Sequence, residues 1–305
     1  MRLRTVESVV AVSMSWIMAL SAASGGVPII GTVVAKGTFR LDNATVTGNA
    51  TLFEGAVIET NGAVSRMELS SGARISLGTN SKARFYGDHM ILEKGEGRLE
   101  KAESFRFEAR GLTIQPETGN ASARVALGGG ARVELAALSG SFRVLNSRGL
   151  LVANVASGHA LELEPQATET ASKLTGNLRL VNGHYLLTDE TTNVTVELAG
   201  SGLVKQVGNR VEVTGQADPT ATPATDASQV IRVSQVKYLG KGVAGNSGAA
   251  AAGQGGAAAG TAAGHGIALS ATTIAIIGGV AAAATLGGLA AAGKLPGQGS
   301  SPVSR

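Results

Sequence analysis

Apolar and polar residues alternate through residues 62–99, and short turn signals interrupt the alternation. The apolar phase of the first two segments consists of Met67, Leu69, Ile75 and Leu77. A period of two is typical of strands that bury one face, and turns containing Gly, such as Ser71-Gly72, separate such strands. The pattern predicts a string of short strands and tight turns. Because it returns further along the chain, we expect a mainly β fold.

An internal repeat lies within this first β region. Residues 66–77 (RMELSSGARISL) align without gaps on residues 124–135 (RVALGGGARVEL). The identical pairs are Arg66/Arg124, Leu69/Leu127, Gly72/Gly130, Ala73/Ala131, Arg74/Arg132 and Leu77/Leu135. Gly55 and Ile58 recur as Gly111 and Ile114, at an offset of 56 residues, whereas the main repeat has an offset of 58. Two copies of one unit, each a strand, a Gly-containing turn and a strand, explain the match, and we place the duplicated domain at residues 30–165.

Four arginines of the repeat, Arg66, Arg74, Arg124 and Arg132, lie on the polar phase of their strands. One interpretation is a paired basic site for a ligand or partner. The other is a solvated outer face on which nearby glutamates balance the arginines. We favour the second interpretation, because exposed alternation needs no ligand to explain it. The four arginines are nevertheless the candidate partner surface.

The segments Ala56-Val-Ile-Glu-Thr60 and Met67-Glu-Leu-Ser-Ser-Gly-Ala-Arg-Ile-Ser-Leu77 resemble the FecR-type periplasmic domain. The resemblance covers about residues 35–165. It implies the β domain of regulators that relay the state of a siderophore receptor to a sigma factor. Such regulators carry a cytoplasmic anti-sigma segment before their membrane helix, whereas eight residues precede the apolar run here. The resemblance therefore implies the domain more strongly than the signalling role.

A second β region spans residues 172–242. Five strand-like segments lie there, and Val181-Asn-Gly-His184 is a strong hairpin signal between the first two. The segment Gly202–Val207 can form a short helix or loop between the third and fourth strands. Five strands with this crossing are typical of a small OB-like barrel, and Asn209–Gly215 resembles the fourth strand of exported OB-like domains.

Charge argues against nucleic acid as the partner of this barrel. Residues 172–242 hold seven Lys and Arg against six Asp and Glu, with Tyr185 and Tyr238 as the aromatic residues. Proteins that bind single strands combine a basic groove with stacking aromatics. The net charge of the whole chain is +4, with no region that carries it strongly. Oligonucleotide binding is therefore the weaker alternative.

Residues 1–23 have the three parts of an export signal. Two arginines precede the mainly apolar run Val9–Leu20, and small residues follow up to Ala23, after which we expect cleavage. The alternative is an uncleaved anchor, but Gly25-Gly26 and Pro28 argue against one continuous helix. We expect the body of the protein to be exported to the periplasmic face of the inner membrane.

The C-terminal part predicts a tether and a membrane anchor. Residues 243–266 are Gly or Ala at all but six positions, as in a flexible linker, and residues 267–293 carry no charge. That run is long enough to cross a bilayer as a helix, with residues 294–305 as a short cytoplasmic tail. Gly279, Ala283 and Gly287 would give the helix a small-residue face for packing against a second copy. The alternative is a soluble low-complexity tail.

No motif in the chain predicts chemistry. There is no cysteine, the four histidines are isolated, and no nucleophile-elbow, phosphate-loop or dinucleotide pattern is present. We therefore expect no catalytic residue, no cofactor and no metal. The resulting hypothesis is a non-enzymatic cell-envelope protein that binds a partner protein or an envelope polymer. The alternatives are a FecR-related sensor in transmembrane signalling and an OB-type oligonucleotide binder.

Overall fold

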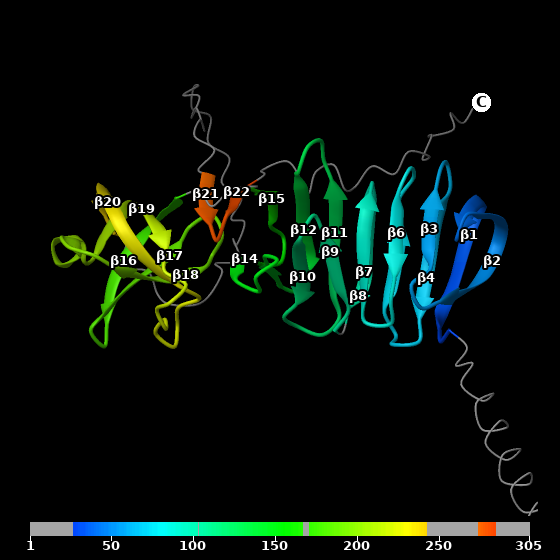
Figure 1. Ribbon diagram of the computed structural model, residues 1–305, viewed down its shortest axis with the longest axis horizontal. Coiled ribbons are helices and arrows are strands. Elements are labelled where there is room, and N and C mark those ends of the chain that lie inside the picture. The colour runs from blue at the N-terminus through cyan, green and yellow to red at the C-terminus, as the bar shows by residue number, and fades with distance from the viewer. Residues whose placement is uncertain (1–26, 103, 167–170, 243–273, 285–305) are drawn as a thin grey trace, which may run out of the picture.

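The computed structural model describes residues 27–102, 104–166, 171–242 and 274–284. Most of these residues are in β-strands and almost none in helices, so the mainly β expectation is confirmed. Several predicted segments lie outside the described residues: the export signal, the linker 243–266, the tail 294–305 and the parts of the run 267–293 on either side of 274–284, which include Gly287. The described chain forms an elongated body whose strands lie across the long axis (Figure 1).

Two rows of strands make up the first part of the body. The first sheet consists, in spatial order, of β1 (Ile29–Leu41), β4 (Val64–Leu69), β5 (Arg74–Leu77), β8 (Glu96–Ala102), β11 (Ala121–Leu127), β12 (Val133–Ser139), β15 (Ala160–Pro165), β22 (Val280–Ala284) and β21 (Ile274–Ile277). The second sheet consists of the C-terminal end of β1, β3 (Val57–Thr60), β6 (Lys82–Phe85), β7 (His89–Lys94), β9 (Arg106–Ala109), β10 (Leu112–Pro116), β13 (Phe142–Leu145) and β14 (Leu151–Val155). β2 (Ala44–Phe53) pairs along β1 at the end of the body.

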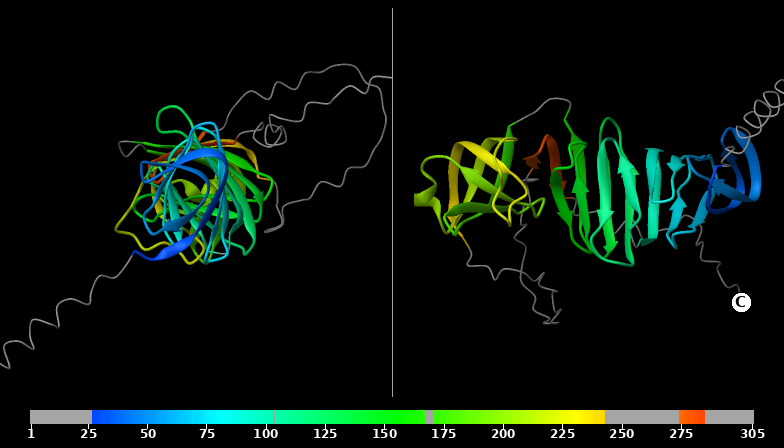
Figure 2. Two further views of the ribbon diagram at one scale, coloured as in Figure 1. Left: turned by 90° about the vertical axis from the view of Figure 1, so that its right-hand side faces the viewer. Right: turned by 60° about the horizontal axis from the view of Figure 1, so that its bottom comes forward.

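The chain alternates between the two sheets as it advances. β4 and β5 form a hairpin in the first sheet, β6 and β7 a hairpin in the second, and β8 returns to the first. Both sheets pack their apolar side chains into one interior, which the view along the long axis shows enclosed by the strands (Figure 2). Its largest fully buried side chains include Phe39, Phe85, Phe107 and Phe142. Burial of these apolar surfaces is the main force that holds the two sheets together.

The internal repeat corresponds to two hairpins of the first sheet. Residues 66–77 belong to β4 and β5, and residues 124–135 belong to β11 and β12. The aligned glycines Gly72 and Gly130 both lie in the left-handed region, with φ of 83° and 69°. A side chain is strained there, which explains why both turns use Gly. β8 lies between the two hairpins and pairs with β5 on one side and β11 on the other.

The five strands of the second β region close into a ring at the other end of the body (Figure 1). They are β16 (Ser172–Val181), β17 (His184–Asp189), β18 (Thr195–Ala199), β19 (Asn209–Ala217) and β20 (Val230–Lys241). β16 pairs with β17 and β19, β17 with β18, and β20 closes the ring by pairing antiparallel with β19 and parallel with β18. The short 3-10 helix Leu203–Gln206 joins β18 to β19.

The expectation of a continuous helix over 267–293 is wrong for residues 274–284. This segment forms the antiparallel hairpin β21–β22, which lies between β15 and the barrel. Gly278 and Gly279 have φ of 55° and 76°, which a two-residue hairpin turn requires and a helix cannot use. The branched side chains before the turn also favour a strand. Within the described ranges, no helix has the length and apolar character needed to cross a bilayer.

Candidate binding face

The outward side of the first sheet carries a groove of about 560 Å³ across β1, β4, β5 and β8. Side chains of the exposed phase of these strands line the groove. The basic ones are Lys36, Arg66, Arg74 and Arg98. Two glutamates, Glu68 and Glu100, also line it. The lining is therefore rich in charge, with four basic groups against two acidic groups.

Strand register places three arginines in one row across the first sheet. Arg66 of β4 is opposite Ser76 of β5, Ser76 is opposite Arg98 of β8, and Arg98 is opposite Arg124 of β11. Neighbouring strands are about 4.8 Å apart, so the backbones of Arg98 and Arg124 are one strand spacing apart. Like charges directly opposite each other on neighbouring strands are unfavourable unless they are compensated.

Glutamates compensate most of the arginines on this face. The guanidinium of Arg66 lies 3.3 Å from Glu100, and that of Arg124 lies 2.8 Å from Glu96. The hydrogen bond to Glu96 raises the pKa of Arg124 above its ordinary value, so this guanidinium stays charged. Such exposed pairs contribute at most about 1 kcal/mol each.

Arg98 and Lys36 have no ion-pair partner among the described residues. Both side chains are exposed, and both line the groove. Arg98 lies directly opposite the compensated Arg124, so it adds a net positive charge to the centre of the row. The groove therefore favours an anionic group at Arg98.

Two valines give the groove an apolar part. Val34 is 50% exposed and Val64 is 53% exposed, although both belong to strands whose other faces are in the core. Val34 is opposite Arg66, and Val64 is opposite Lys36 in the β1–β4 register. Exposed valines beside basic side chains are a surface that a segment carrying both carboxylates and apolar side chains can cover.

The structure separates the four arginines that the repeat singles out. Arg66 and Arg124 share the row, but Arg74 lies two positions away toward one end of the strands, opposite Glu68. Arg132 lies toward the other end, 3.1 Å from Glu162. The paired four-arginine site is therefore not formed as a single cluster. The residue that sequence reasoning missed is Arg98, which belongs to neither copy of the repeat.

Gly279 and Ala283 are not on a helix face either. Gly279 is the second turn residue of the hairpin, and Ala283 pairs with Ile274 and with Glu162 of β15. Their small side chains serve strand pairing and a tight turn.

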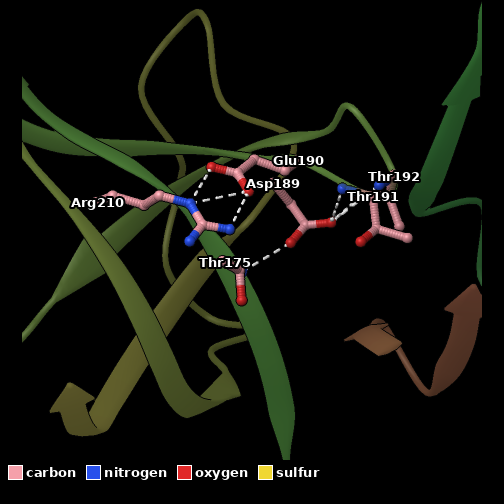
Figure 3. Close-up of polar contacts among 6 residues, drawn as sticks. All are labelled: Thr175, Asp189, Glu190, Thr191, Thr192 and Arg210. Atoms are coloured by element: carbon pink, nitrogen blue, oxygen red, sulfur yellow. Dashed lines mark hydrogen bonds and ion pairs between the residues drawn. The ribbon is translucent and has the colours of Figure 1, made fainter. Parts of the chain in front are cut away.

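A second polar cluster lies in the barrel, where β17 ends (Figure 3). The Asp189 carboxylate is fully buried and accepts hydrogen bonds from the backbone N–H of Thr175 at 2.8 Å, and from both the N–H and the hydroxyl of Thr192 at 2.9 Å. Burial raises the pKa of Asp189 above its ordinary value, against the opposite effect of these hydrogen bonds. The adjacent Glu190 points toward Arg210, which binds it through two nitrogens. The cluster fixes the turn after β17 to β16 and β19.

Comparisons with known proteins leave the chain without an assigned family. No protein-family model matches it, and no curated protein matches it. One solved structure with partial similarity is the crystal structure of a "putative anti-sigma factor" from Parabacteroides distasonis ATCC 8503, with a TM-score of 0.31 and 14% identity. The match covers 35% of this chain and 54% of that chain. A TM-score this low establishes neither a shared fold nor a shared function.

Metal-ligating groups do not gather in the described ranges. No set of three His, Asp or Glu side chains there is placed to hold an ion.

Proposed function

We propose that the protein is a non-enzymatic binding protein of the cell envelope, and that the groove across β1, β4, β5 and β8 holds an extended acidic segment of a partner protein. The observation that carries the proposal is the uncompensated Arg98 in the arginine row, together with the exposed valines at the other side of the same groove. An exported location rests on the export-signal pattern of residues 1–23.

The composition of the groove selects the chemistry of the segment. Carboxylates would pair with Arg98 and Lys36, where charge-assisted hydrogen bonds are stronger than neutral ones. The contacts with Val34 and Val64 require an apolar side chain between the acidic ones. A simple polyanion would satisfy the first requirement and leave the valines exposed to water. A polypeptide in an extended conformation satisfies both requirements when acidic and apolar side chains lie two residues apart, because such side chains point to the same face.

The barrel supports a second, structural part of the proposal. The ring β16–β17–β18–β20–β19, with β18 and β20 parallel, has the strand order of an OB-like domain. We infer an OB-like barrel at residues 172–242 and an FecR-like domain at residues 30–165. The balanced charge of the barrel, seven Lys and Arg against six Asp and Glu, does not favour oligonucleotide binding.

Fluorescence anisotropy with a labelled 12-residue peptide of three Glu-Glu-Val-Val repeats, which presents both Glu and Val on each face of an extended chain, tests the groove. The double variant Arg66→Glu/Arg98→Glu should bind the peptide at least about tenfold more weakly, which corresponds to about 1.4 kcal/mol. The affinity of the wild-type protein should also fall as salt rises, because exposed charges are screened. Arg179→Glu, an exposed arginine of the barrel, is the matched control and should bind like the wild type.

The same assay separates the alternatives. Equal binding of the double variant and the wild type would refute the groove as the site. Equally tight binding of polyglutamate would replace the protein partner with an anionic polymer. Binding of single-stranded DNA that Arg66→Glu/Arg98→Glu leaves unchanged would move the function to the barrel.

A further inference from the structure

The hairpin β21–β22 is inserted between two parts of the chain that precede it by about a hundred residues (Figure 1). β22 pairs antiparallel with β15 over five residue positions, Val280–Ala284 against Leu161–Pro165. β21 pairs with β16 of the barrel at Ile276 and Lys173. The hairpin therefore completes the first sheet by strand addition, in which main-chain hydrogen bonds supply the attachment.

Asn146 and Gln166 bind the turn of the hairpin, and the residues around them form what we call the acceptor site. The side-chain amide of Asn146, which is only 8% exposed, donates to the carbonyl of Gly278 at 2.8 Å. Its oxygen accepts from the N–H groups of Arg148 and Leu150 at 3.0 Å, so the amide is held in one orientation. The N–H of Gln166 donates to the carbonyl of Gly279 at 2.8 Å. A Cβ on Gly278 would lie 3.1 Å from Asn146, so the site is shaped for glycine.

Apolar side chains of the hairpin fill the end of the common core. Ala275, Ile277, Val280 and Ala282 are at most 2% exposed. Their outward neighbours Ala281 and Ala283 lie opposite Glu164 and Glu162 of β15. Loss of the hairpin would uncover the edge of β15 and the side chains packed below it. An uncovered edge strand readily pairs with another strand.

Nothing at the acceptor site depends on which molecule supplies the hairpin. All the contacts described above join residues 274–284 to residues 146–173, and 32 residues, 242–273, separate β20 from β21. At about 3.4 Å per residue, that length of chain spans at most about 100 Å, which is enough to reach a neighbouring molecule. The same contacts are then available from a second copy.

We propose that β21–β22 is an exchangeable element and that its partner is a second copy of this chain, which receives the hairpin between β15 and β16. Reciprocal exchange closes a dimer with two-fold symmetry, whereas one-way exchange continues from molecule to molecule. The full set of main-chain hydrogen bonds is kept in both arrangements, so concentration decides between the folded-back and the exchanged forms.

Cysteine cross-linking tests this proposal cleanly because the natural chain has no cysteine. Two single variants of the full chain, Glu164→Cys and Ala281→Cys, are mixed under conditions in which the hairpin can exchange, and then oxidised. The paired backbones of these positions permit a disulfide. We expect a covalent heterodimer whose yield rises with protein concentration, identified by mass spectrometry of the linked peptides.

The matched register control combines Glu164→Cys with Ala283→Cys, which lies two positions out of register. It should give at least about tenfold less heterodimer, because the Cα atoms are too far apart for a disulfide. The double variant Glu164→Cys/Ala281→Cys should form its disulfide within one chain at low concentration. If the double variant links but the mixed single variants do not exceed the register control, the hairpin is fixed and exchange is refuted. If the double variant does not link, the docked hairpin itself is wrong.

Discussion

Asp189 is the most deeply buried carboxylate of the described residues, and its surroundings predict what a minimal substitution does. In Asp189→Asn, one oxygen could still accept from Thr175, but the new NH₂ group would face the N–H groups of Thr191 and Thr192. Donors that face donors lose their hydrogen bonds, and a buried unsatisfied group costs about 1–3 kcal/mol. Urea unfolding should show a loss of this size, while Asp226→Asn, at an exposed position, should stay within about 0.5 kcal/mol.

The pH dependence of the stability difference between the wild type and Asp189→Asn gives a second test of this substitution. Burial raises the pKa of Asp189 above 3.8, so the folded state holds the proton more tightly than the unfolded state. The stability that this group contributes is therefore fully present below the unfolded pKa and is lost as pH rises through the folded pKa. Relative to Asp189→Asn, the wild type should lose stability as pH rises from about 4. A relative gain would show that the hydrogen bonds outweigh burial and that the pKa is lowered.

Arg98 is the residue of the candidate site that could not be predicted from the sequence. The exposed side chain of Arg98 agrees with the alternation in Glu96-Gly-Arg98-Leu-Glu100, but no spacing in the sequence links it to Arg66 or Arg124. The three meet because β8 pairs with β5 on one side and β11 on the other. Such nonlocal pairing is decided by the packing of the whole sheet, so the arginine row becomes visible only in the structure.

At the scale of elements, the turn between β11 and β12 offers a matched pair of glycines. Gly130 has φ of 69°, whereas neighbouring Gly129 is outside the left-handed region, and a Cβ at either position meets nothing within 4 Å. Strain alone therefore distinguishes them. Gly130→Ala should destabilise the protein by about 1 kcal/mol, and Gly129→Ala should be neutral or slightly stabilising. Urea midpoints measure both effects, and equal midpoints for the two variants would contradict the left-handed turn.

The C-terminal run shows where element prediction fails for a physical reason. Absence of charge over 267–293 measures how apolar the segment is, but it does not say whether lipid or protein covers it. In residues 274–284 the cover is protein, since Ile277 and Val280 pack into the core beside β15. Gly278-Gly279 was the available signal, because two adjacent glycines between branched residues favour a hairpin turn. The hairpins of the repeat were predicted from the same kind of signal.

At the scale of the whole molecule, alternation predicts which face of a strand is buried but not which strand is its neighbour. The alternation of hairpins between two sheets and the parallel closure of β18 on β20 both depend on partners distant in sequence. The join between the first sheet and the barrel is the clearest case, because the hairpin that fills it comes from the far end of the chain.

This join predicts how the two parts of the body unfold. The hairpin contacts β15 on one side and β16 on the other, and Asn154 of β14 adds hydrogen bonds to the barrel turn at Thr192 and Asn193. We expect the wild-type protein to unfold in one calorimetric transition, because the parts share these contacts. Ile277→Asp would bury an unpaired charge and undock the hairpin, so two transitions should appear, the first at a lower temperature. Ala284→Asp, at the exposed end of β22, is the control and should keep one transition. A single unchanged transition in Ile277→Asp would mean that the hairpin does not couple the two parts.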